Sequence, residues 1–75
     1  MKRYVFRARR KAGDRELLYF AGWEAPDRMF AKWLVFESGA LVMDKVLLDL
    51  TMEQGMTKME EENREFWDFE LVEKA

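Results

Sequence analysis

The sequence YVFRARRKAGDRELLYFAGW, residues 4–23, contains two apolar segments separated by a polar turn. In its first part, Tyr4, Phe6 and Ala8 fall on one side, while Val5 and the arginines at 7 and 9 fall on the other. A two-residue period is typical of a half-buried β-strand. Residues 11–14, Lys-Ala-Gly-Asp, then supply turn chemistry, because a glycine accepts positive φ. The sequence therefore predicts a β-hairpin whose first strand spans residues 4–10.

The second strand of this hairpin is predicted over residues 16–23. Its side chains divide between one face with Leu17, Tyr19, Ala21 and Trp23 and another face with Leu18, Phe20 and Gly22. Both faces are apolar, which is typical of a strand covered on both sides. We therefore expect this strand to lie inside the sheet rather than at its edge.

Residues 24–36 allow two interpretations. Pro26 interrupts the second strand, since proline cannot donate to a ladder. Residues 31–36 are a short aromatic and branched run that ends at Ser38-Gly39, which favours a turn over 26–29 followed by a third strand. The alternative is a helix that begins at Pro26 and carries an apolar face at Met29, Phe30, Trp33 and Leu34.

Two helices and a last strand are predicted after Gly39. Ser38 is a candidate N-cap for a helix whose inward positions are Leu41, Met43, Val46, Leu47 and Leu50. Gly55 suits a helix end, and Thr57-Lys58-Met59-Glu60 has the form of a capping box, which predicts a second helix over 58–64. Residues 66–73 alternate between Trp67, Phe69, Leu71 and the acids Asp68 and Glu70, as a strand does.

These elements predict a single α+β domain over residues 1–75. We expect an antiparallel sheet of three to four strands with one or two helices packed on one face, in the order β-β-(β)-α-α-β. Charge is distributed unevenly along the chain, because residues 1–15 hold seven bases and one acid, while residues 51–75 hold eight acids and three bases. The first and last strands would neutralise each other if they pair.

The residues needed for most catalytic chemistry are missing. The chain has no histidine and no cysteine, so zinc sites, thiolate nucleophiles and Ser-His-Asp triads cannot form. The hydroxyl side chains of Ser38, Thr51 and Thr57 fall where helix caps are expected. The four glycines are isolated from one another, so no phosphate-binding glycine loop exists. We expect a protein that is not an enzyme, with no catalytic residues, metal or cofactor.

Two charged surfaces are candidate binding sites. The candidate basic surface comprises Arg3, Arg7, Arg9, Arg10, Lys11 and Arg15, and arginines beside exposed aromatic rings would suit a single-stranded nucleic acid. The candidate acidic surface comprises Glu60, Glu61, Glu62, Glu65 and Asp68, which could dock in a basic groove of another protein. An ordinary solvated helix face is the alternative interpretation of these acids.

At the level of layout the chain resembles the small accessory proteins of bacteriophages and other mobile elements, among them anti-CRISPR and other host-takeover inhibitors. The resemblance rests on the opening Tyr4-Val5-Phe6-Arg7 strand, the Tyr19 to Trp23 strand, one amphipathic helix and the closing strand from Asp68 to Glu73. It implies a stoichiometric inhibitor or adaptor that blocks a surface of a host protein. No functional residue is carried over, because these proteins share no motif.

The expected partner is therefore another protein, of host origin. Nucleic acid is the alternative partner, and a second copy of the chain is a further one. No apolar run approaches the roughly 20 residues that span a bilayer, so we expect no membrane insertion. The absence of cysteine suits a reducing compartment, which predicts a cytoplasmic location.

Overall fold

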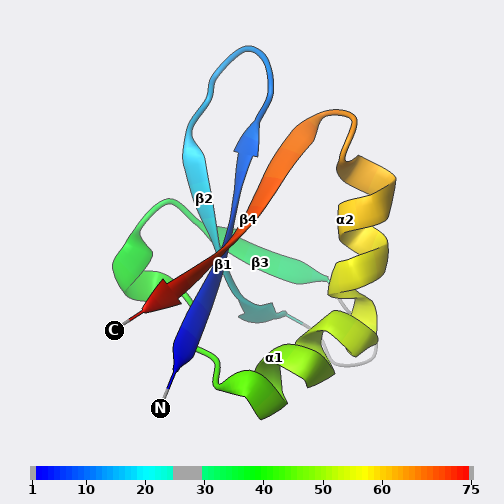
Figure 1. Cartoon of the computed structure of the whole chain (residues 1–75). Helices are drawn as coiled ribbons and strands as arrows, with labels where there is room; N and C mark the ends of the chain where they lie inside the picture. Colours follow the sequence, from blue (N-terminus) through cyan, green and yellow to red (C-terminus); the bar gives the residue numbers. More distant parts are fainter. Residues whose placement is uncertain (1, 25–29, 75) are drawn as a thin grey trace.

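A computed structural model describes residues 2–24 and 30–74 of the chain (Figure 1). The strands are β1 (Arg3–Arg10), β2 (Leu17–Trp23), β3 (Ala31–Leu34) and β4 (Trp67–Lys74). The helical segments are η1 (Glu37–Gly39), α1 (Lys45–Thr51), η2 (Met52–Met56) and α2 (Thr57–Asn63), of which the last three follow one another directly. The predicted α+β class with an antiparallel sheet is confirmed.

The four strands form one antiparallel sheet in the order β3-β2-β1-β4. The predicted hairpin is present, and β2 lies inside the sheet, as its two apolar faces indicated. β4 pairs with β1 along its whole length, from Trp67 opposite Arg10 to Lys74 opposite Arg3. The expected pairing of the basic first strand with the acidic last strand is therefore confirmed. Ala31 to Leu34 is a strand, whereas the turn predicted at 26–29 falls outside the described residues.

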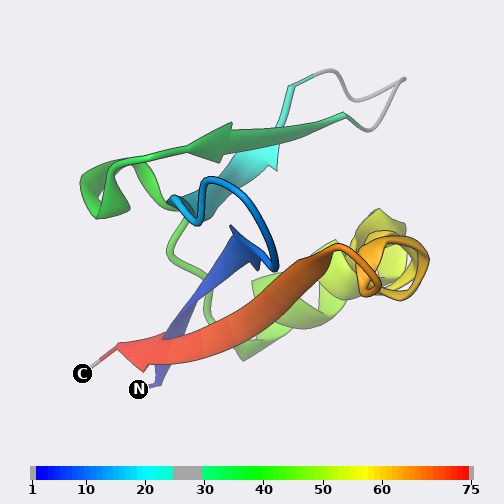
Figure 2. The same cartoon turned by 90° about the horizontal axis from the view of Figure 1, so that it is seen from above.

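The helices cover one side of this sheet, and η1 lies on the other side (Figure 2). The main core lies between the sheet and the helices, and it consists of Phe6, Phe20, Met43, Leu48 and Met56. Phe20 is completely buried and packs edge to face against Trp23 and Trp33, with ring centroids 5.2 and 5.7 Å away. Aromatic rings from two strands thus organise the centre of the fold.

The hairpin strands separate at the end away from their turn. Backbone pairing between β1 and β2 runs from Arg9 opposite Leu17 to Arg7 opposite Tyr19. Beyond it, the Leu41 amide donates to the Phe20 carbonyl at 2.9 Å, and Met43 exchanges two 2.8 Å hydrogen bonds with Tyr4. The segment between η1 and α1 therefore fills the gap between the two strands, which carries Met43 into the core.

An irregularity in β2 places Trp23 on the helix side. The sequence pattern put Trp23 on the face with Tyr19, but the register with β3 shifts between Phe20 and Trp23. Gly22 adopts φ 113° at this shift, a conformation that suits a residue without a Cβ. One extra residue reverses the alternation, so Trp23 packs on Phe20 instead of facing away from it.

Asp44, not Ser38, caps the first helix. The Asp44 side chain accepts a 2.8 Å hydrogen bond from the Leu47 amide, whereas Ser38 lies in η1. Because the helix starts later than predicted, a different set of its residues faces the core. Leu48 is buried, while Val46 is 78% exposed and Leu50 is 48% exposed. The prediction that Val46 and Leu50 point inward was wrong because it used a helix beginning about six residues too early.

The helix does not stop at Gly55. Helical segments continue from Lys45 to Asn63 through η2, and Gly55 forms a kink with φ 157° and ψ −8°. Thr57 has helical dihedral angles, and no side chain caps α2. The predicted capping box is therefore absent, because the chain bends within a helical run instead of starting a new one. None of the described helices is long and apolar enough to cross a membrane.

Candidate functional site: an apolar pocket beside an acidic helix

Part of the basic charge of β1 is neutralised by β4. Arg7 lies opposite Glu70, and its Nη2 and Nε atoms donate to Glu70 Oε2 at 2.7 and 3.0 Å. These hydrogen bonds raise the pKa of Arg7 above its ordinary value. Lys11 approaches Asp68 at 3.9 Å, and Lys2 approaches Glu73 at 4.0 Å. The two charge blocks of the sequence thus meet in the sheet.

The six bases of the candidate basic surface do not share one face. Arg3, Arg7 and Arg9 alternate with Tyr4, Phe6 and Ala8, so they lie on the side of the sheet away from the helices. Arg10 belongs to the helix side, where its guanidinium stacks 5.1 Å from the ring centroid of Trp67. Six residues line a shallow hollow of about 150 Å³ on the far side: Arg7, Arg9, Arg15, Leu17, Asp68 and Glu70.

The candidate acidic surface is also divided. Asp68 follows Trp67 and precedes Phe69, which both face the helices, so Asp68 points to the opposite side of the sheet. The remaining four carboxylates, Glu60, Glu61, Glu62 and Glu65, belong to α2 and the turn after it. We call these four the acidic helix surface. Glu60 is half-buried, and the other three are exposed.

The acidic helix surface has little compensating charge. Lys58 lies 3.9 Å from Glu62, but Glu60, Glu61 and Glu65 form no ion pair with any described base. Residues 44–65 contain seven acids and three bases, whereas the rest of the chain contains ten bases and eight acids. The molecule is therefore electrically polarised, with an acidic helix layer against a slightly basic remainder.

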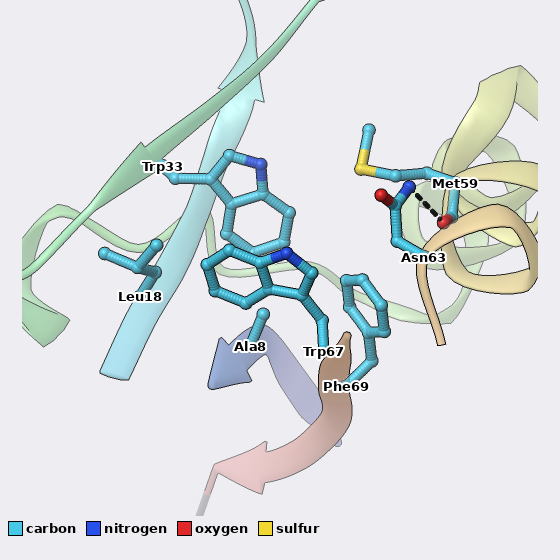
Figure 3. A pocket seen from close by; sticks show the side chains of 7 residues that line it. All are labelled: Ala8, Leu18, Trp33, Met59, Asn63, Trp67 and Phe69. Carbon is cyan, nitrogen blue, oxygen red and sulfur yellow. Dashed lines mark hydrogen bonds between the residues drawn. The ribbon is translucent and has the colours of Figure 1, made fainter. Parts of the chain in front are cut away.

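An apolar pocket of about 200 Å³ opens between α2 and the sheet (Figure 3). It is lined by Ala8, Leu18, Trp33, Met59, Asn63, Trp67 and Phe69. These side chains come from all four strands and α2. In Figure 3 the two indole rings and the Phe69 ring converge from the sheet, while Met59 and Asn63 reach in from the helix. A lining of this kind suits an apolar or aromatic group.

Asn63 is the one polar side chain in the lining. Its Nδ2 atom donates to the Met59 carbonyl at 2.8 Å, which fixes the side chain against α2. The other end of the amide, Oδ1, is directed toward the pocket (Figure 3) and is available to accept a hydrogen bond. The pocket can therefore hold an apolar group that carries a single donor, such as an indole.

Sequence reasoning missed this pocket. Trp33, Trp67 and Phe69 were all recognised as apolar strand positions, and apolar strand positions are normally filled core. Ala8 is the small residue that follows Tyr4 and Phe6 on the helix side of β1, and it lines the pocket opposite Leu18 on β2 and Phe69 on β4. A small residue opposite large ones was the only available signal, and it carries no information about how far α2 lies from the sheet.

Comparison with known proteins adds no identification. No protein-family model matches the chain, and neither the curated proteins nor the solved structures give a match. Within the described residues, no three acidic side chains gather closely enough to hold a metal ion.

Proposed function

We propose that the chain is a non-enzymatic protein-binding module that docks its acidic helix surface on a basic surface of a partner protein. The observation that carries the proposal is the charge of Glu60, Glu61 and Glu65, which form no ion pair with a base among the described residues. Carboxylates within a neutralised network add little at long range, but unpaired ones steer a basic partner into contact. The acids of β4 are unsuitable for this role, because Glu70 is already bonded to Arg7.

The apolar pocket beside the acidic helix surface can supply binding energy, which long-range charge attraction alone does not provide. Binding energy at protein interfaces is concentrated in a few apolar or aromatic anchors, whereas rim charges mainly set the association rate. Met59 and Asn63 line the pocket and belong to the same helix as Glu60 to Glu62. A partner segment with one aromatic side chain flanked by lysine or arginine matches both features.

The class of partner follows from the resemblance described above. A small protein with polarised charge suits a stoichiometric inhibitor or adaptor that occupies a host protein's surface, as phage anti-defence proteins do. Occupying a basic groove would block the nucleic acid or the acidic protein that normally binds there. The absence of cysteine suits a reducing compartment, and on this ground we propose that the module acts in the cytoplasm.

Nucleic-acid binding is a second candidate, favoured by the hollow that Arg7, Arg9 and Arg15 border on the far side of the sheet. Phosphate contacts by arginine would provide the affinity. Asp68 and Glu70 line the same hollow, however, and Glu70 already holds Arg7. A phosphate entering it would meet carboxylates, so the protein-binding proposal is preferred.

Affinity capture from the native host's lysate, with and without nuclease, separates the two candidates. Four versions of the tagged protein are compared: wild type, Glu61→Lys with Glu65→Lys, Glu16→Lys with Glu73→Lys, and Arg9→Ala with Arg15→Ala. The variant with Glu16→Lys and Glu73→Lys is the matched control, because it makes the same charge change away from α2. We expect to capture one protein in stoichiometric amount. Its capture should survive nuclease and should be lost only with Glu61→Lys and Glu65→Lys.

Two results would contradict the protein-binding proposal. Equal capture by the Glu61 and Glu65 variant and by the control would remove the acidic helix surface from the interface. Capture that depends on nucleic acid and is lost with Arg9 and Arg15 would support the second candidate instead.

A further inference from the structure

The outer edge of β4 is open for strand pairing. β4 is the last strand of the sheet, and no described segment pairs with its outer side. The Lys11 amide donates to the Phe66 carbonyl at 2.9 Å, so residues 66, 68, 70, 72 and 74 direct their backbone groups toward β1. Because this orientation alternates in an antiparallel pair, Trp67, Phe69, Leu71 and Glu73 present free amides and carbonyls at the open edge.

The position of Tyr4 supports the same alternation independently. Tyr4 exchanges both of its backbone hydrogen bonds with Met43, on the side of β1 away from β4. Its partner across the β1–β4 ladder is Glu73, so Glu73 must also direct its backbone groups outward. An edge that offers four outward residues is a template for another strand.

The charges along β4, together with the length of the overlap, favour one register for pairing with a second copy of the same strand. Residues that pair in an antiparallel ladder must share the same orientation, so the two-fold axis passes through one residue and its copy. An axis at Glu70 opposes two glutamates, and an axis at Phe69 opposes Asp68 with Glu70. An axis at Val72 places Glu70 opposite Lys74 but joins only residues 70–74, two fewer than an axis at Leu71.

An axis at Leu71 opposes no two acids, and it places Phe69 opposite Glu73 of the second copy. It joins residues 68–74 and places Asp68 opposite Lys74 of the second copy at both ends. Lys74 also donates to Glu37 at 2.6 Å, but an ammonium has three donors and can hold both carboxylates. On the helix side, Leu71 meets Leu71 of the second copy. Leu71 is 42% exposed in one chain, and this contact would cover it.

We propose that the chain forms a two-fold dimer by antiparallel pairing of β4 with β4 of a second copy, with Leu71 on the axis. The two sheets then form one continuous sheet with all helices on the same face. Pairing of this kind supplies main-chain hydrogen bonds at an otherwise unpaired edge. It also suits a chain of 75 residues, because a single core of this size gives a small margin of stability.

Sedimentation equilibrium tests the dimer, with circular dichroism to verify that each variant is folded. The wild type should have twice the 9.1 kDa mass of one chain. Leu71→Arg brings two guanidinium groups face to face on the axis, and such like-charge contact across an interface costs several kcal/mol, so the dissociation constant should rise by about tenfold or more. Val46→Arg is the matched control: it replaces an exposed apolar residue on α1 and should leave the dimer intact. A monomeric wild type at millimolar concentration, or equal dissociation of both variants, would overturn the proposal.

Thiol cross-linking tests the register, since the chain has no cysteine of its own. The Cα atoms of a hydrogen-bonded antiparallel pair lie about 5.5 Å apart, within the reach of a disulfide. Leu71→Cys should therefore form a cross-linked dimer under mild oxidation. Glu73→Cys should not, because each strand rises about 3.4 Å per residue and the two thiols would lie roughly 14 Å apart. Efficient cross-linking through Glu73→Cys, or none through Leu71→Cys, would refute this register.

Discussion

Replacing Gly55 with alanine tests the kink that directs α2 over the pocket. In a regular helix interior, Gly→Ala stabilises a protein by about 1 kcal/mol. Gly55 has φ 157°, where a Cβ is strained, and holding a residue in such a conformation costs roughly 1–3 kcal/mol. The added Cβ would lie 3.5 Å from Trp23 Cη2, an ordinary contact. The backbone conformation, not crowding, therefore sets the expected loss of about 1–3 kcal/mol.

Urea unfolding monitored by tryptophan fluorescence measures this loss. The wild type should unfold with a free energy of roughly 4–11 kcal/mol for a domain of this size, so Gly55→Ala should remain folded with its melting temperature lowered by about 4–8 °C per kcal/mol. Gly13→Ala is the comparison, because Gly13 has φ 76° with nothing within 4 Å of its added Cβ, and it should cost roughly 1–2 kcal/mol. A neutral or stabilising Gly55→Ala would refute the kink, since that is the behaviour of a regular helix.

Three further predictions concern single contacts. Asp44→Ala should lower the unfolding free energy by about 1 kcal/mol, because it removes the cap on the Leu47 amide, whereas Asp44→Ser should keep most of it; urea unfolding distinguishes the two. Trp23→Phe removes the 3.0 Å bond from Nε1 to Gln54 Oε1 and should cost about 1 kcal/mol, with a less than additive effect when combined with Gln54→Ala. The hydrogen bond from Lys74 holds the pKa of Glu37 below its ordinary value of 4.5. The contribution of this pair to the free energy of unfolding is therefore fully present above pH 4.5, and it is lost as the pH falls through the lowered pKa. The urea midpoints of wild type and Glu37→Gln should therefore differ at about pH 6 and converge toward about pH 3, and a difference that persists in acid would exclude this origin.

The sheet could be predicted because the patterns that specify it lie within short stretches of the sequence. Alternation in residues 4–10 and 67–71 places Phe6 and Phe69 on the helix side, and complementary charge predicts that β1 and β4 pair. Two apolar faces in residues 17–21 place β2 inside the sheet. Each of these inferences needs only a two-residue period and the sign of neighbouring charges.

The errors arose where tertiary structure overrides local preference. Ser38 has the chemistry of an N-cap, but residues 40–43 are needed between β1 and β2, so the helix starts at Lys45 with Asp44 as its cap. A glycine such as Gly55 normally ends a helix, but here it forms a kink and the helical run continues into α2. Gly22 permits an extra residue in β2, which moves Trp23 to the opposite face from the one that alternation predicts.

The candidate site was predictable only in part. Glu60 to Glu65 were recognised as an acidic cluster from composition, and this cluster does lie on α2 and its following turn. That Asp68 belongs to the other side of the sheet follows from the same alternation that defines β4. The pocket under Leu18 and Trp67 depends on the spacing between α2 and the sheet, which no local pattern specifies.

If the acidic helix surface steers a basic partner, as we propose, the association rate should depend on ionic strength. Once the captured partner is purified, stopped-flow mixing should show a rate constant that falls steeply as salt is added, because screening weakens long-range attraction. Glu61→Lys with Glu65→Lys should lower the rate at low salt and flatten this dependence, while Glu16→Lys with Glu73→Lys should change it much less. An association rate that is insensitive to salt, or equally affected by both pairs, would contradict the account.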